Sequence, residues 1–212
     1  AIWRQWLKDK GVKMVFIDPF HNYTAAAMDG KWIAPRLGTD AAIAMAVAYV
    51  WLTEGTYDKD YIKDRTLGFD EFKDYILGKN GGQAKTPVWA DEESGVPARI
   101  ITALAREWAS KRTVLAGGSR GGEGGACRQA YGTEWARMMV LLQAMQGLGK
   151  PGVSIWGTTM GAPFDASIWF PGYADPDGRM SSTRAAQQTP VNPTAQRLYR
   201  PDVPDAILNP PY

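Results

Sequence analysis

A glycine-rich stretch over residues 117–125, GGSRGGEGG, is where this sequence most clearly offers ligand chemistry. It falls between an expected strand and an expected helix, the place where parallel α/β folds bind their ligands. Free backbone amides and a helix N-terminus there favour an anionic group such as a phosphate, and Arg120 and Arg128 add positive charge. No Gly-Lys-Ser/Thr sequence closes the stretch, so it is not a P-loop. A plain glycine loop without a ligand is the alternative.

Two aspartates stand at the ends of expected elements. Asp18 ends a strand and Asp40 begins a helix, both at the expected carboxyl edge of a sheet. A carboxylate there can accept two hydrogen bonds from the N–H and NH2 edge of a guanine, or bonds from a ribose hydroxyl. For Asp40 the residues alone favour a simpler role, that of an ordinary N-cap.

Other familiar site patterns are excluded. The segment GLGKPG at residues 147–152 matches a dinucleotide-binding pattern, but it follows a helix and precedes a strand, which is the reverse of the required order. We interpret it as a helix end with a tight turn. The single histidine, His21, and the single cysteine, Cys127, lie far apart, so no zinc or iron–sulfur site with closely spaced ligands is expected here. No Ser/His/Asp arrangement is visible.

Composition narrows the class of protein. The 212 residues are 45% hydrophobic and 22% charged, which is typical of a globular protein that can bury a core. A net charge of +2 gives no indication of nucleic-acid binding, so no nucleic-acid partner is expected. The apolar run over residues 41–52 is shorter than the roughly 18 residues of a spanning helix. We therefore expect a buried helix there and no membrane span.

The elements that would position these residues alternate between helices and strands. Periodicity predicts helices over residues 2–10, 41–54, 58–65, 69–77, 86–94, 97–111 and 129–146, and strands over 12–17, 113–117 and 153–156. Residues 19–38 show no sustained period and are expected to be irregular. The order predicts an α/β fold with a parallel sheet and helices on its faces. Residues 157–212 hold nine of the 14 prolines and predict a long irregular region packed on other parts of the protein.

The combined motifs resemble the third domain of the dimethyl sulfoxide reductase family of molybdopterin oxidoreductases. The marks, in order, are Asp18-Pro19, Thr24, Trp32-Ile33, Gly38-Thr39-Asp40, Tyr57-Asp58 and Gly68-Phe69-Asp70. TPVWADEESGVPARIITALAREWA is similar to the next helix pair of the family, and the GLGKPG turn also fits. The resemblance is strong over residues 1–156 and looser beyond. Within the family, EWARMMVLLQAMQGLGKPGVSIWG and FPGY are most similar to the large subunits of pyrogallol–phloroglucinol transhydroxylases.

The resemblance implies a Rossmann-like domain over residues 1–156 that binds a bis-molybdopterin guanine dinucleotide carrying molybdenum or tungsten, followed by the irregular region over 157–212. In the family, the aspartates of the Asp-Pro and Gly-Thr-Asp motifs bind guanine, and the glycine-rich loop approaches the pterin or its pyrophosphate. The implied cofactor-binding residues are Asp18, Thr24, Gly38, Thr39, Asp40, Gly117, Gly118, Ser119 and Arg120. Pterin dithiolenes hold the metal, so no metal ligand is expected here. The family's metal-ligating residue and iron–sulfur cysteines lie earlier in its chains, so we expect an internal segment of a longer subunit.

The resemblance also implies an activity, hydroxyl transfer on a polyhydroxylated aromatic ring with no net redox change. The metal centre would activate the ring while acid and base side chains move protons. Tyr173, in FPGY, is the one candidate catalytic residue, with a packed aromatic as the favoured alternative. His21, three residues after the strand end, is a weaker candidate for contact with a cofactor phosphate.

Two other functions stay open at this point. One is an oxygen-atom-transfer reductase of the same family, and the other is a non-catalytic scaffold that retains only the cofactor domain. Expected partners are the remainder of the catalytic subunit and a small aromatic substrate, with an iron–sulfur electron-transfer subunit as a further option. The compartment is open between cytoplasm and periplasm, with a slight preference for the cytoplasm.

Overall fold

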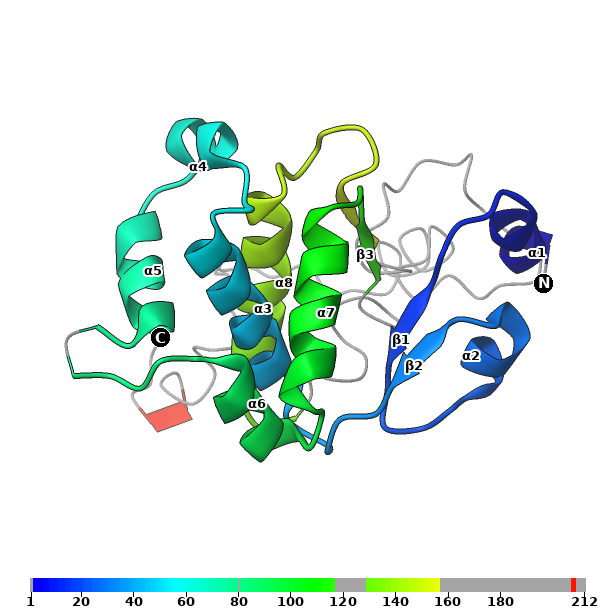
Figure 1. Cartoon of the computed structure of the whole chain (residues 1–212), viewed down its shortest axis with the longest axis horizontal. Helices are drawn as coiled ribbons and strands as arrows, with labels where there is room; N and C mark the ends of the chain where they lie inside the picture. The colour runs from blue at the N-terminus through cyan, green and yellow to red at the C-terminus, as the bar shows by residue number, and fades with distance from the viewer. Residues whose placement is uncertain (1, 80, 117–128, 157–206, 209–212) are drawn as a thin grey trace. The chain divides into compact units, whose positions relative to one another are not determined.

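The computed structural model describes residues 2–79, 81–116, 129–156 and 207–208. Apart from Ile207 and Leu208, these residues belong to the first of two units, Ala1–Pro163. Helices dominate this unit, and its strands are short (Figure 1). The described elements, in chain order, are α1 (Ile2–Asp9), β1 (Val15–Ile17), α2 (Tyr23–Met28), β2 (Lys31–Ile33), α3 (Asp40–Glu54), α4 (Lys59–Arg65), α5 (Phe69–Leu77), α6 (Pro87–Ser94), α7 (Ala98–Ala109), β3 (Val114–Ala116), α8 (Gly132–Met145) and β4 (Ser154–Trp156).

Helix α3 is the centre of the hydrophobic core. Its 15 residues are apolar around almost the whole circumference, the pattern of a helix buried on all sides. It packs against α5, α6, α7 and α8, and α7 and α8 lie beside it in Figure 1. The side chain of Trp51 is fully buried, and its indole Nε1 donates to the carbonyl of Ala105 in α7 at 2.7 Å. The predicted buried helix is therefore confirmed.

Local sequence signals explain where the surrounding helices begin and end. Helix α6 begins after Thr86, whose hydroxyl accepts a hydrogen bond from the Trp89 amide, and Pro87 occupies its first turn. Gly95 ends it in the left-handed conformation. Helix α7 buries one apolar face, made of Ile101, Leu104, Ala105 and Trp108, as its spacing predicts. No helix among the described residues is long and apolar enough to cross a membrane.

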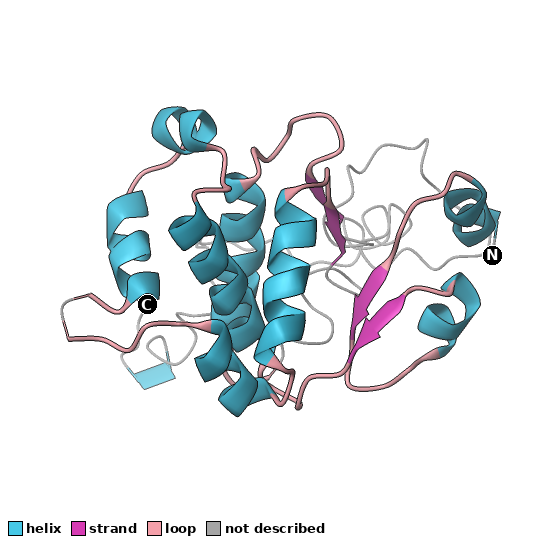
Figure 2. Ribbon diagram, in the orientation of Figure 1, coloured by secondary structure: helices cyan, strands magenta, loops and turns pink. Residues whose placement is uncertain are grey.

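The described strands form two separate parallel pairs (Figure 2). In the first pair Val15 of β1 faces Lys31 of β2, and in the second Val114 of β3 faces Ser154 of β4. The side chain of Gln143, fully buried on α8, donates to the carbonyls of Thr113 and Ser154 at 2.8 and 2.6 Å. The predicted α/β class and parallel pairing are confirmed. The strands that the structure describes do not form the single sheet that we expected.

The expectation that residues 19–38 are irregular is wrong. They contain α2 and β2, which are too short to show a period in the sequence. Helix α2 is capped by Asn22, and Asp29 ends it with φ of 52°. At Gly30 a Cβ atom would lie 2.6 Å from the ring of Phe16, so a glycine is needed for the chain to run back beside β1.

Candidate functional site

Asp18 follows the carboxyl end of β1, as predicted, and its carboxylate organises the next turn. Oδ1 accepts a hydrogen bond from the Phe20 amide at 2.8 Å, and Oδ2 accepts one from Nδ2 of Asn22 at 2.9 Å. The side chain of Asn22 in turn accepts from the amides of Thr24 and Ala25, which caps α2. Among the described residues, each carboxylate oxygen of Asp18 accepts one hydrogen bond, and a carboxylate oxygen has room for a second.

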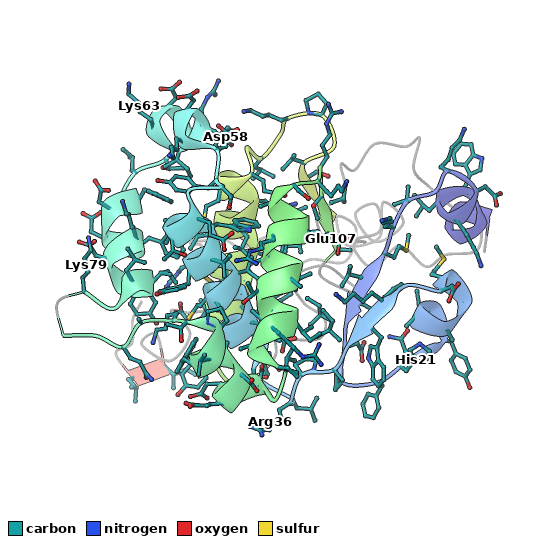
Figure 3. All side chains as sticks on the ribbon, in the orientation of Figure 1. His21, Arg36, Asp58, Lys63, Lys79 and Glu107 are labelled. Atoms are coloured by element: carbon teal, nitrogen blue, oxygen red, sulfur yellow. The ribbon has the colours of Figure 1, made fainter. Side chains whose placement is uncertain are left out.

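The other residues near Asp18 differ in their exposure. The hydroxyl of Thr24 makes no hydrogen bond to another described residue, and its backbone belongs to the first turn of α2. His21 is exposed (Figure 3), and its ring lies 5.2 Å from that of Trp32. The indole Nε1 of Trp32 donates to the backbone carbonyl of Asp18 at 2.7 Å. These contacts hold the carboxyl ends of β1 and β2 together beside the half-buried Asp18 side chain.

The Gly-Thr-Asp motif forms the turn into α3. Gly38 has φ of 82°, a conformation that favours glycine. Thr39 occupies the N-cap position, but its hydroxyl donates to the carbonyl of Arg36 at 2.7 Å and does not cap the helix. Arg36, labelled in Figure 3, binds the end of α6 through a hydrogen bond from its own amide to the Ser94 carbonyl. The turn is therefore fixed to the helical core.

Asp40 is the first residue of α3 and does not serve as its N-cap, so the simpler alternative for this residue is wrong. Its half-buried carboxylate accepts, at Oδ2, a hydrogen bond of 2.8 Å from Nε2 of Gln129. Gln129 directly follows residues 117–128, which include the glycine-rich stretch. The contact therefore brings Gln129 to the Gly-Thr-Asp turn. No hydrogen bond between described residues links this turn to the Asp18 group.

The remaining predicted site residues lie outside the described residues. They are Gly117, Gly118, Ser119 and Arg120 of the glycine-rich stretch and Tyr173. Within the described part of the chain, no group of three or more His, Cys, Asp or Glu side chains could hold a metal ion. The groups that the structure does place, half-buried carboxylates beside backbone turns, suit a ligand that presents N–H or O–H donors.

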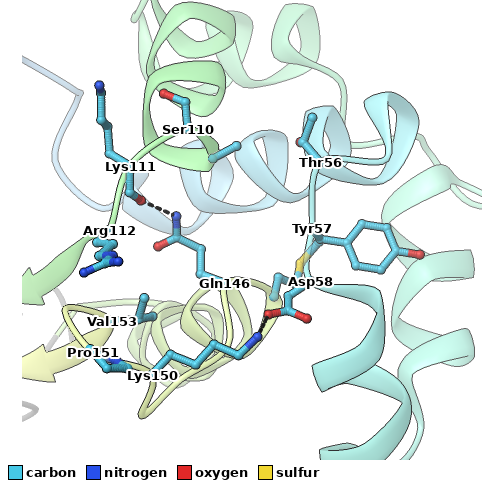
Figure 4. Close-up of a pocket in the computed structure, with 12 residues that line it drawn as sticks. Thr56, Tyr57, Asp58, Ser110, Lys111, Arg112, Gln146, Lys150, Pro151 and Val153 are labelled. Carbon is cyan, nitrogen blue, oxygen red and sulfur yellow. Dashed lines mark hydrogen bonds and ion pairs between the residues drawn. The ribbon is translucent and has the colours of Figure 1, made fainter.

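A hollow of about 520 Å³ lies at the opposite end of α3 (Figure 4). A helix of 15 residues is about 22 Å long, so the hollow, which begins at Thr56, is well removed from Asp40. Lys111, Arg112 and Lys150 are among its lining residues. The GLGKPG turn forms one wall, and its three positive-φ glycines confirm the tight turn that we predicted. The hollow is not the predicted cofactor site.

The polar groups of the hollow hold neighbouring elements together. Asp58 caps α4 by accepting from the Tyr61 amide at 3.0 Å, and it forms an ion pair with Lys150. The Lys150 ammonium, followed by the Tyr61 amide, lowers the pKa of the Asp58 carboxyl below its ordinary value. On the neighbouring helices Arg106 pairs with Glu54 at 2.7 Å, and this hydrogen bond lowers the Glu54 pKa and raises the Arg106 pKa.

Two residues of the site were missed by sequence reasoning. Asn22 carried a usable signal, because Asn is among the best N-cap residues and stands just before α2. Gln129 carried none, because 89 positions separate it from Asp40 and no local pattern connects them.

Comparison with known proteins finds a matching family and several similar sequences. The family model described as molybdopterin oxidoreductase matches residues 1–196. The pyrogallol hydroxytransferase large subunit of Pelobacter acidigallici is 56% identical over 172 residues, covering 81% of this chain and 20% of that protein. The dimethyl sulfoxide/trimethylamine N-oxide reductase of Rhodobacter capsulatus is 40% identical over 147 residues, covering 69% and 17%. The trimethylamine-N-oxide reductase of Haemophilus influenzae is 38% identical over 143 residues, covering 67% and 17%.

A solved structure shares the fold. Acetylene hydratase from Pelobacter acetylenicus aligns with a TM-score of 0.57 and 23% identity, over 66% of this chain and 18% of that one. At this identity the likeness concerns the fold alone. The chain spans about a fifth of the length of the curated relatives that it matches.

Proposed function

The chain belongs to the molybdopterin oxidoreductase family, and on that premise we propose that it is part of the catalytic subunit of a hydroxyl-transferring molybdenum or tungsten enzyme. Its substrate class is polyhydroxylated aromatics, of the pyrogallol and phloroglucinol type. The observation that carries this proposal is the 56% identity to a pyrogallol hydroxytransferase large subunit, against 34–40% to the reductases of the family. A second subunit follows from the words "large subunit" in that relative's name, and an iron–sulfur electron carrier is the kind that we propose.

The described residues fit the guanine end of a bis-molybdopterin guanine dinucleotide. Guanine presents an N–H and an NH2 group on one edge, and a carboxylate with one free acceptor position on each oxygen can receive both. Among the described residues, Asp18 accepts one hydrogen bond at each oxygen and Asp40 accepts one at Oδ2, which leaves such positions for a ligand. Thr24, whose amide binds the Asn22 side chain that contacts Asp18, offers a hydroxyl with no hydrogen bond to another described residue. The Gly38 and Thr39 turn, fixed through Arg36, sets the direction in which Asp40 faces.

When bound, the cofactor supplies a metal centre that activates the aromatic ring. Residues of this chain bind and orient it. Gly117, Gly118, Ser119 and Arg120 are proposed to receive the pterin or its pyrophosphate through backbone amides and one guanidinium. Tyr173 is proposed to lie near the substrate, where a phenol can hold or pass a proton.

The finer fold is also part of the proposal. In the complete subunit β1–β2 and β3–β4 would be parts of one Rossmann-like parallel sheet. Two observations support this, the parallel pairing of both strand pairs and the helices between them. The division into a cofactor domain over 1–156 and an irregular region over 157–212 is proposed with it.

The first experiment measures molybdenum, tungsten and guanine nucleotide per catalytic subunit in the natively purified enzyme. About one metal atom and two guanosine monophosphates released by acid hydrolysis are expected for a bis-dinucleotide cofactor. Turnover of pyrogallol without an electron donor then separates hydroxyl transfer from the second candidate, an oxygen-atom-transfer reductase. That candidate rests on the identity of 40% to a sulfoxide and N-oxide reductase, and predicts turnover of dimethyl sulfoxide with a reduced dye. Material without metal or nucleotide would favour the scaffold.

Substitution of Asp40 tests the assigned site. Asp40→Ala should lower the guanine nucleotide content of the purified enzyme or shorten its retention. Asp70→Ala is a matched control, because Asp70 also lies in the first turn of a helix but is exposed. Equal nucleotide retention in the two variants would remove Asp40 from the site.

A further inference from the structure

The contact between Gln129 and Asp40 joins two segments that lie 89 positions apart in the sequence. Gln129 begins the turn directly before α8, and Asp40 lies at the start of α3. Nε2 of Gln129 donates to Oδ2 of Asp40 at 2.8 Å in a half-buried environment. A hydrogen bond to a charged group is stronger than one between neutral groups and fixes the plane of the carboxylate.

The backbone of Gln129 is held in place independently of its side chain. Its carbonyl accepts a hydrogen bond from the Gly132 amide at 3.0 Å, which closes a turn directly before α8. Tyr131 within this turn has φ of 61°, and the carbonyl of Tyr131 accepts from the Trp135 amide as α8 begins. Helix α8 packs on α3, and this packing holds the turn before α8 near the N-terminus of α3.

The other side of the Gln129 amide faces Gly38. A Cβ atom on Gly38 would lie 4.0 Å from Oε1 of Gln129, an ordinary contact distance. The amide therefore contacts Asp40 through Nε2, while Oε1 lies on the side of Gly38 without touching it. No other hydrogen bond from a described residue reaches Oδ1 or the second acceptor position on Oδ2 of Asp40, and a donor pair on one ligand edge requires two such positions.

From this geometry we infer that Gln129 is a positioning residue for the guanine-binding carboxylate. It orients Asp40 toward the nucleotide end of the ligand and ties that carboxylate to the turn before α8. This inference rests on the proposed function, since it takes Asp40 as a guanine ligand. It adds a residue that contacts Asp40 and that none of the family motifs includes.

The test compares retention of the cofactor by the complete holoenzyme. Gln129→Met keeps the length of the side chain and removes its amide. Gln146→Met is the matched control, because Gln146 makes three hydrogen bonds to Trp108 and Lys111 at the far end of α8. The holoenzymes are incubated at equal intervals below their own melting temperatures, and guanosine monophosphate is determined in the protein fraction after gel filtration. Gln129→Met should shorten the retention half-life about tenfold, the loss of one hydrogen bond to a charged group, whereas Gln146→Met should keep it near wild type.

The double variant makes the outcome specific. If Gln129 acts through Asp40, then Asp40→Asn combined with Gln129→Met loses no more retention than Asp40→Asn alone. Additive losses, or a wild-type half-life in Gln129→Met, would overturn the inference and leave the proposed function intact. A wild-type half-life in Asp40→Asn would overturn the guanine assignment itself, and the role of Gln129 with it.

Discussion

Trp51 anchors the helix that carries Asp40, so its replacement should loosen the whole helical core. Its side chain is fully buried, donates to the Ala105 carbonyl at 2.7 Å, and meets the ring of Trp108 edge to face at 5.4 Å. Trp51→Phe removes the N–H donor and part of the ring. The lost hydrogen bond costs about 1 kcal/mol and the unfilled volume about another 1 kcal/mol. Trp51→Ala removes nearly all contacts and should cost about 3–5 kcal/mol.

The assay is native-state hydrogen exchange of the purified enzyme, followed at the amides of α3 and α7. It reports the free energy of local opening without requiring the whole protein to unfold in one step. Trp89→Phe on α6 is the control, because Trp89 is half-buried and its Nε1 makes no hydrogen bond to a described residue. That variant should change the opening free energy by less than about 1 kcal/mol. Equal losses in Trp51→Phe and Trp89→Phe would refute the role given to the buried hydrogen bond.

Three further outcomes are expected. Asp58→Asn should lower the opening free energy of α4 by about 0.5 kcal/mol at pH 7, through loss of the ion pair with Lys150, because the Asn side chain can still accept from the Tyr61 amide and cap the helix. The folded-state pKa of Asp58 lies below its ordinary 3.8, so this stabilisation is present above pH 3.8 and disappears as the pH falls through the folded-state pKa. Hydrogen exchange measured down to pH 3 should therefore show a shrinking difference in opening free energy between wild type and Asp58→Asn. Gln143→Glu should destabilise β3 and β4 by about 3 kcal/mol or more, because it buries a charge, whereas Gln143→Leu should cost about 2 kcal/mol. Hydrogen exchange at both strands measures the two losses, and a smaller loss in the Glu variant than in the Leu variant would contradict this reasoning. Asn22→Ala should lower amide protection in α2 by about 1 kcal/mol, and unchanged protection would show that the Asp18–Asn22 pair does not cap the helix.

The sequence predicts the helical core well because burial and periodicity coincide there. Helix α3 was expected over 41–54 and spans Asp40–Glu54, since an apolar run bounded by Thr39 and Gly55 has few alternatives. Helix α2 and strand β2 could not be predicted in the same way. They have six and three residues, and they depend on the Asn22 cap and on pairing with β1. Such elements are set by tertiary contacts that leave no period in the sequence.

The residues of the candidate site likewise differ in how far the sequence predicts them. Asp18 and Asp40 follow from the rule that ligand groups gather at the carboxyl ends of parallel strands and at helix starts. Their partners do not, because Asn22 and Gln129 act through side-chain hydrogen bonds whose geometry is decided by packing. The structure adds the hydrogen bond from Gln129 to Asp40.

The Gln143 side chain also determines how long the turn after α8 can be. Because one amide group binds carbonyls on both sides of the β3–β4 pair, the eleven positions from Gln143 to Ser154 act as a spacer of fixed length. An extra residue within GLGKPG would pull Ser154 out of register with Val114. The connection between α5 and α6 is held at Gly78 and Lys85, but a Cβ atom on Gly81 would meet no atom within 4 Å. A tag or a fluorescent label inserted into this enzyme therefore belongs at Gly81.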